Sequence, residues 1–91
     1  MLEVVLSNRF KKDLKLAAKR GCDLNLLESI VDQLAAQQPP PEKNRDHDLT
    51  GDYIGFRECH IRPDWFLIYR VDGEQLLLFL FRTGTHSDLF D

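Results

Sequence analysis

The stretch Trp65–Arg82, which reads WFLIYRVDGEQLLLFLFR, decides the fold of this chain. Its first part, Trp65–Val71, is rich in aromatic and β-branched residues and predicts a strand, whereas Asp72-Gly73 indicates a hairpin turn. The second part, Gln75–Arg82, is almost wholly apolar, so both of its faces are expected to be buried. The pattern therefore predicts a hairpin whose second strand lies inside a sheet.

Two further strands are expected on either side of this hairpin. Tyr53–Ile61 is strand-like and leads into the hairpin through the turn Arg62-Pro63-Asp64. Leu2–Leu6 is short and valine-rich, which predicts an opening strand. Because the last strand of the meander keeps a free edge, Leu2–Leu6 is expected to pair with it in parallel. The predicted sheet is twisted and has four strands.

Two helices are expected between the opening strand and the meander. The first follows Ser7-Asn8, which suits an N-cap, and stops at Gly21; the second is capped by Asp23 and runs to about Gln38, before three prolines. Each helix has an apolar face, so the pair should form an αα-hairpin packed on one face of the sheet. Residues 39–52 are expected to form a loop. The order β-α-α-β-β-β predicts a single α+β domain over residues 1–91.

The composition excludes several classes of protein. The longest apolar run, Leu76–Phe81, is far shorter than the ~20 residues that cross a membrane. The N-terminus lacks the cations of a signal peptide, so a cytoplasmic location is expected, with no membrane partner. Cys22 and Cys59 form no CxxC pair, and Cys59 and His60 point to opposite faces of a strand, so no disulfide framework, metal site or cofactor is expected.

The charge of the chain is divided unevenly along its length. The net charge of -3 argues mildly against a nucleic-acid binder, because counterion release rewards basic surfaces. Residues 1–22, however, hold six basic residues against two acidic ones. Four of these bases share one face of the first predicted helix: Lys11, Lys12, Lys15 and Lys19. The chain therefore has a basic helix on an acidic protein.

The three histidines, His47, His60 and His86, all lie in the C-terminal half of the chain. In a meander they can converge at one end of the sheet, and Glu58 shares a strand face with His60. The tight turn after this strand should aim Asp64 back towards His60, which suits a paired acid and base. Together with a cation, such groups are what RNA scission by its own 2′-hydroxyl requires.

Two side chains admit two interpretations each. Trp65 begins a strand and suits the core as well as a platform for a ligand. Arg82 ends a buried strand and needs an anionic partner. That partner is either Asp64 or Glu58, within the protein, or a phosphate of a substrate.

A series of motifs runs through residues 46–90: Asp46-His47-Asp48-Leu49, Gly51-Asp52, Phe56–Trp65, Leu67-Ile68-Tyr69 and Arg82–Phe90. They resemble the YafQ-type branch of the RelE/ParE toxins of bacterial toxin–antitoxin systems, and the opening strand and helices fit that branch as well. The resemblance implies a small RelE-like fold and a metal-independent endonuclease that cleaves mRNA in the ribosomal A site. It also implies a DNA-binding cognate antitoxin that forms a hetero-oligomer with the toxin and represses its own operon.

The resemblance also implies a role for each matching residue. The acid–base set falls on His47, His60, Asp64 and His86, and the phosphate-stabilising arginine is Arg82. Substrate contacts fall on Trp65 and Phe90, with Glu58 at a position where relatives often have Asp. The basic helix face with Lys11, Lys12 and Lys15 is expected to contact ribosomal RNA, with a merely solvated face as the alternative.

Two other functions use the same fold. One is a non-catalytic toxin of the ParE branch, which inhibits a topoisomerase by binding, and the other is a degenerate chain that only binds its antitoxin. The histidines with Asp64 and Arg82 favour the nuclease, because a binding module needs no groups that titrate near neutral pH. No broken motif supports the degenerate chain.

Overall fold

The computed structural model describes residues 1–90, so Asp91, the last residue of the expected domain, lies outside the described residues. The helices and strands follow one another as β1 (Glu3–Leu6), α1 (Asn8–Lys19), α2 (Leu24–Ala35), β2 (His47–Asp48), β3 (Arg57–Arg62), β4 (Trp65–Asp72), β5 (Leu77–Gly84) and α3 (His86–Phe90). Two short 3₁₀ turns, Glu42–Asn44 and Gly51–Tyr53, flank β2.

The sheet has five strands in the order β1-β5-β4-β3-β2. As predicted, β1 pairs in parallel with β5, and the meander β3-β4-β5 is antiparallel. The predicted number of four strands was wrong, because the loop before β3 returns to the sheet edge. There His47 and Asp48 pair with Glu58 and Arg57, which adds the two-residue strand β2.

The helices are capped as the sequence predicts. Ser7 Oγ accepts a hydrogen bond from the Phe10 amide at 2.9 Å, and the Asp23 carboxylate accepts one from the Asn25 amide at 3.0 Å. Gly21 takes a left-handed φ of 78° after α1. The second helix ends at Ala35 rather than Gln38, because Gln37 is left-handed with a φ of 60° and Pro39 follows.

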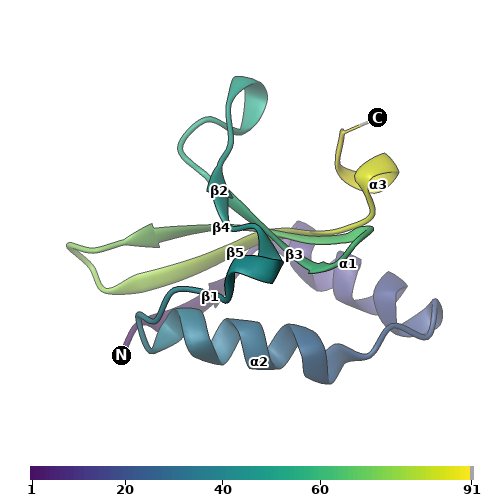
Figure 1. The fold of residues 1–91 in the computed structure, drawn as a ribbon, viewed down its shortest axis with the longest axis horizontal. Helices are drawn as coiled ribbons and strands as arrows, with labels where there is room; N and C mark the ends of the chain where they lie inside the picture. The colour runs from purple at the N-terminus through teal and green to yellow at the C-terminus, as the bar shows by residue number, and fades with distance from the viewer. Residues whose placement is uncertain (91) are drawn as a thin grey trace.

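The sheet buries a different cluster of side chains on each face. The larger cluster joins sheet residues such as Leu67 and Leu78 to Phe10 of α1 and Leu34 of α2. The smaller one lies on the other face and centres on Phe66, Ile68 and Leu89, with Tyr53 and Phe56 packed against it. Figure 1 shows α2 along one side of the sheet, with β2 and α3 on the other side. The two faces therefore have different covers.

The segment Tyr53–Phe56 provides part of the cover on the second face. It was expected to begin a strand, but β3 starts only at Arg57, because the preceding residues form a 3₁₀ turn and fold over the sheet. The last strand also differs from the expected Gln75–Arg82 and spans Leu77–Gly84. Its pairing with β4 passes from Arg82 to Leu80, so Phe81 is the extra residue of a β-bulge. Arg82 directly follows this bulge.

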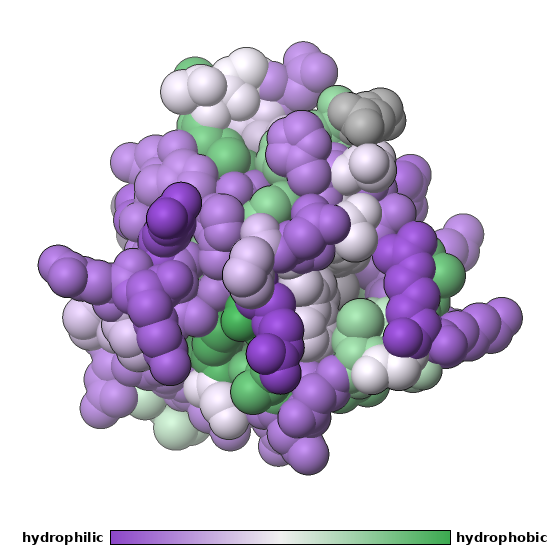
Figure 2. All heavy atoms as spheres, turned by 45° about the vertical axis from the view of Figure 1, so that its right-hand side comes forward, coloured by the Kyte–Doolittle hydropathy of each residue, from purple (hydrophilic) through white to green (hydrophobic). Residues whose placement is uncertain are grey.

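One face of the molecule is mostly polar. Figure 2 shows hydrophilic side chains over most of one face of the molecule, with small apolar areas between them. The exposed apolar residues include Leu16 and Leu24, which are 41% and 37% exposed on the two long helices. Within residues 1–90, no helix is long and apolar enough to cross a membrane.

Candidate active site

The three histidines meet on the face of the sheet opposite the two long helices. His47 lies in β2, His60 in β3, and His86 begins α3. The rings of His47 and His60 have centroids 6.3 Å apart, and His60 packs edge-on against Phe66 at 4.5 Å. The same Phe66 ring lies 6.3 Å from that of His86. The fold thus gathers the three predicted imidazoles on one face, two of them against the buried Phe66 and the third beside His60.

Glu58 lies beneath two of these histidines. Its Oε1 is 3.5 Å from His47 Nε2 and 3.8 Å from His60 Nε2. The residue is only 5% exposed, and its Oε2 has no hydrogen-bond partner in the part of the chain that is described. Burial raises the pKa of Glu58. A substrate contact was expected for Glu58, but its side chain is too buried to reach the surface. It contacts His47 and His60 from below instead.

The ring of His47 is oriented by the backbone. Its Nδ1 lies 2.6 Å from the carbonyl oxygen of Arg45, and because a carbonyl can only accept, this nitrogen carries a hydrogen and donates it. The other nitrogen, Nε2, consequently faces Glu58. The Glu58 carboxyl group lies within ion-pair distance of both His47 and His60, so it connects the two imidazoles.

Arg57 fixes the short strand that carries His47. Its guanidinium donates to Asp46 at 2.9 Å and to Asp48 at 2.5 Å, the residues on either side of His47. The hydroxyl of Tyr69 also donates to Asp46. These side chains lie on three strands or their flanks, and a strand of two residues has few backbone bonds of its own. Arg57 therefore stabilises the strand that positions His47.

Asp64 contacts the third histidine rather than the second. Its Oδ1 accepts a hydrogen bond from the backbone amide of His86 at 3.2 Å. The expected return of Asp64 towards His60 is not seen, because the start of α3 lies over the turn. A second carboxylate, Asp88, accepts from Arg20 at 2.6 Å and from the Thr85 amide at 2.9 Å. The two carboxylates together hold the five-residue helix α3 in place.

Arg82 has an ionic partner that the sequence did not indicate. Its Nε and one terminal nitrogen donate to the Asp13 carboxylate at 2.9 and 3.1 Å, so the partner is neither Asp64 nor Glu58. The Thr83 amide donates to the same carboxylate at 3.1 Å. This pairing raises the pKa of Arg82, which stays charged. Arg82 has five N–H groups, and these bonds use two of them, so three can bind a phosphate.

The two predicted aromatic contacts have different surroundings. Trp65 is buried in the core beneath the helices, and its indole N–H donates to Thr83 Oγ1 at 2.9 Å. It therefore belongs to the core and offers no free face to a base. Phe90 is 38% exposed, and its ring lies 5.1 Å from that of His86. Phe90 therefore has an exposed ring beside one of the histidines, where a substrate contact is still open to it.

The basic residues of α1 and its C-terminal end differ in their surroundings. Lys11, Lys12 and Lys15 are exposed, as expected either of a face that binds RNA or of a solvated face. Arg20, by contrast, is bound by Asp88. Asp13 is the only acidic residue within this lysine-rich helix, and that isolation was the one sequence signal of its pairing with Arg82.

Comparisons with known proteins identify the family of this chain. The family model described as "Bacterial toxin of type II toxin-antitoxin system, YafQ" matches residues 2–91. The chain is 40% identical over 89 residues to the "mRNA interferase toxin YafQ" of Escherichia coli K12, which covers 97% of this chain and 95% of the relative.

Solved structures show the same fold. A metal-bound toxin from Helicobacter pylori superposes with a TM-score of 0.93 at 47% identity, covering 99% of this chain and 100% of that one. The toxin fold in the E. coli DinJ-YafQ toxin-antitoxin complex superposes with a TM-score of 0.89 at 40% identity, with coverage of 99% and 98%.

Proposed function

Because the chain belongs to the YafQ family of bacterial toxins of type II toxin-antitoxin systems, we propose that it is an endoribonuclease that cleaves mRNA in the ribosomal A site. One observation carries the proposal: His60 and His86 both pack against Phe66, and His47 lies beside His60 on the same face of the sheet. Acid–base groups in such proximity can move both protons that RNA cleavage requires. Work on translating ribosomes would place the protein in the cytoplasm.

The base in this mechanism is His60. Burial, followed by the charges of Arg45 and His47, lowers the pKa of His60, so its imidazole is neutral at pH 7 and can accept a proton. It takes the proton of the 2′-hydroxyl, whose oxygen then attacks the adjacent phosphorus. His47 and Glu58 lie beside it and can pass this proton on.

The acid in this mechanism is His86. It donates a proton to the departing 5′-oxygen, so the bond from phosphorus to the 5′-oxygen breaks as the bond to the 2′-oxygen forms. The products are a 2′,3′-cyclic phosphate and a 5′-hydroxyl. Arg82 stabilises the charge on the phosphorane through the N–H groups that Asp13 does not occupy. Asp64 is a positioning residue, because it acts through the backbone of His86.

The chemistry proposed here needs no metal ion. Protons are moved by imidazoles and charge is balanced by a guanidinium, which together replace the roles of a Lewis acid. No group of three or more His, Cys, Asp or Glu side chains among residues 1–90 is placed to hold a metal. Although the H. pylori relative is described as metal-bound, we expect cleavage by this chain to persist in excess EDTA.

The ribosome positions the substrate in this proposal. The side chain of His47 is 48% exposed, so it does little by itself to align an RNA strand, and the ribosome would hold the strand over the site. Positioning by another body can lower the barrier by about 7 to 11 kcal/mol. Lys11, Lys12 and Lys15 would bind ribosomal RNA phosphates along α1.

A cognate antitoxin would neutralise the protein. The E. coli relative has been solved in complex with its antitoxin DinJ, and we propose an equivalent DNA-binding partner in a hetero-oligomer that represses its own operon. Leu16 and Leu24 leave apolar area exposed on the long helices. The antitoxin would cover this area together with the histidine face.

The test is single-turnover cleavage of a defined mRNA on programmed ribosomes, with the same transcript without ribosomes as the control. We expect cuts within the A-site codon, and losses of at least 10²-fold for His60→Ala and His86→Ala variants that remain folded. Equal cleavage of the naked transcript would contradict the ribosome requirement. Inhibition of topoisomerase without cleavage would favour the ParE-like alternative.

A further inference from the structure

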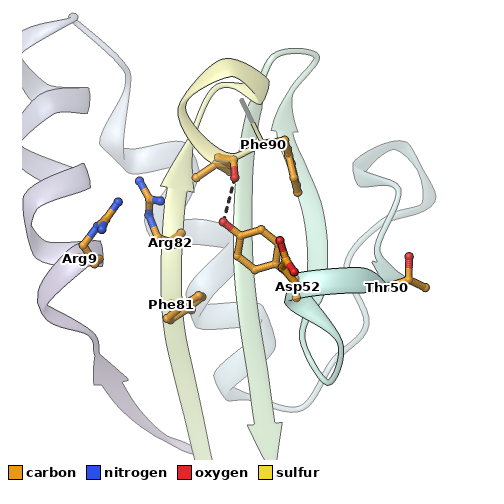
Figure 3. A pocket seen from close by; sticks show the side chains of 8 residues that line it. Arg9, Thr50, Asp52, Phe81, Arg82 and Phe90 are labelled. Atoms are coloured by element: carbon orange, nitrogen blue, oxygen red, sulfur yellow. Dashed lines mark hydrogen bonds between the residues drawn. The ribbon is translucent and has the colours of Figure 1, made fainter.

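A cavity of about 640 Å³ lies beside the histidine cluster, and of the residues that line it the mechanism above uses only Arg82. It is bounded by the start of α1, the end of β5, the turn before β3 and α3. Figure 3 shows Arg9 and Arg82 along one side and Asp52 along the other, with Phe90 above and Phe81 below. Tyr53 also lines the cavity. Its volume lies in the range of sites for small ligands.

The cavity has a second positive charge in Arg9. This residue is exposed, and none of the ion pairs formed among residues 1–90 involves it. Arg82, on the same side, has only two of its N–H groups bound by Asp13. The Asp13 carboxylate balances the charge of Arg82, so the unbalanced positive charge on this side of the hollow is that of Arg9. This side of the cavity is therefore suited to a phosphate.

Aromatic rings form the opposite side. The hydroxyl of Tyr53 donates to the Leu89 carbonyl at 2.8 Å, which fixes the ring. The Tyr53 ring lies 5.5 Å from Phe90 and 6.1 Å from Phe81, both nearly perpendicular to it. Phe90 also touches His86, so it separates the cavity from the acid of the proposed mechanism. Such rings can hold an unstacked base.

Asp52 and Thr50 give the cavity a polar rim. Asp52 is exposed and makes no side-chain hydrogen bond within the described chain. A carboxylate near a polyanion is unfavourable unless it accepts hydrogen bonds from the ligand. The exocyclic amino groups of adenine, cytosine and guanine can donate such bonds, whereas uracil presents two carbonyl oxygens and a single N–H.

We propose that this cavity binds the nucleotide next to the scissile phosphate, and that Asp52 selects a base with an exocyclic amino group. The proposal rests on the proposed ribonuclease function and adds a specificity pocket to it. Arg9 holds the phosphate of the selected nucleotide, and the Tyr53 and Phe90 rings hold its base. Asp52 and Arg9 are specificity residues and take no part in the bond exchange.

The first experiment measures single-turnover cleavage of mRNAs that carry each of the four bases on either side of the cut. The wild type should disfavour uracil at one flanking position by about tenfold or more. Asp52→Asn should reduce this preference to less than about threefold, because an amide can also donate to uracil carbonyls. The control Asp32→Asn makes the same change on α2 and should leave the base preference intact. Arg9→Ala should raise KM and leave the base preference unchanged. The control Arg62→Ala should leave KM unchanged.

An unchanged base preference in Asp52→Asn would overturn the proposal, even if the wild type cleaves normally. A second experiment does not depend on cleavage: NMR titration of the isolated protein with pentanucleotides that carry 2′-O-methyl groups and cannot be cut. We expect shifts of the Tyr53 and Phe90 ring signals with oligo-A and markedly weaker ones with oligo-U. Equal shifts, or none at these rings, would also overturn it, whereas selective binding without cleavage would refute only the ribonuclease.

Discussion

Asp13→Ala is expected to lower the free energy of unfolding by about 3 kcal/mol. The carboxylate accepts two hydrogen bonds from Arg82 and one from the Thr83 amide, and the two charged side chains are only 11% and 13% exposed. Removing one partner of a buried ion pair costs about 3 to 5 kcal/mol, and the slight exposure favours the lower end. For a chain of this size, that loss corresponds to a fall in Tm of roughly 12 to 24 °C.

The assay is urea unfolding of Asp13→Ala, Arg82→Ala and the double variant, with Asp13→Asn as the control that keeps an acceptor for the Thr83 amide. The free energy of unfolding lost in the double variant should be smaller than the sum of the two single losses by at least about 1.5 kcal/mol, because the second change removes a charge already left unpaired. Additivity within about 0.5 kcal/mol would refute the pairing. Below its Tm, Asp13→Ala should also cleave at least about tenfold more slowly, because Arg82 is no longer oriented.

Three further predictions concern pH, salt and the antitoxin. Because the pKa of His60 is lowered from its ordinary value of 6.5, the cleavage rate should increase with pH and reach its plateau at a pH below 6.5; His60→Ala should abolish this increase. Protein stability should fall as the pH drops below about 6.5, because the histidine of the unfolded state then binds a proton that folded His60 does not. Lys11→Glu with Lys15→Glu should weaken ribosome association and reduce its salt dependence by about one unit of log–log slope per lost phosphate contact, and an unchanged salt titration would favour a solvated face. Leu16→Glu should loosen the antitoxin complex and change stability by less than about 0.5 kcal/mol, as measured by calorimetry and thermal melting; an equally tight complex would exclude this part of α1 from the interface.

Local patterns of sequence predicted most of the fold. Ser7, Gly21 and Asp23 marked the helix ends because capping and left-handed backbone depend on the residue itself. The apolar run of β5 indicated a strand with two neighbours, and its parallel pairing with β1 followed from the free edge. Each of these features depends on residues that are close together in the sequence, and a single sequence predicts such local features well.

The contacts between distant segments were not predictable in the same way. The pairing of Arg82 with Asp13 joins residues 69 positions apart, and the sequence offered Asp64 and Glu58 as nearer candidates. The strand β2 depends on Arg57 binding the carboxylates beside His47, which no periodicity reports. Trp65 could be assigned to core or surface only once the helices were placed over it. These are tertiary choices among several partners of similar chemistry.

The pairing of the first strand with the last has a consequence for the order of synthesis. Ser7 Oγ donates to the carbonyl of Phe81, 74 residues later, and within residues 1–90 the edge strand β1 pairs with β5 alone. A nascent chain therefore cannot complete its sheet, or assemble His86 with the other histidines, until nearly all of it has left the ribosome. Under the proposed function, a chain that is still being synthesised therefore cannot cut the message from which it is read.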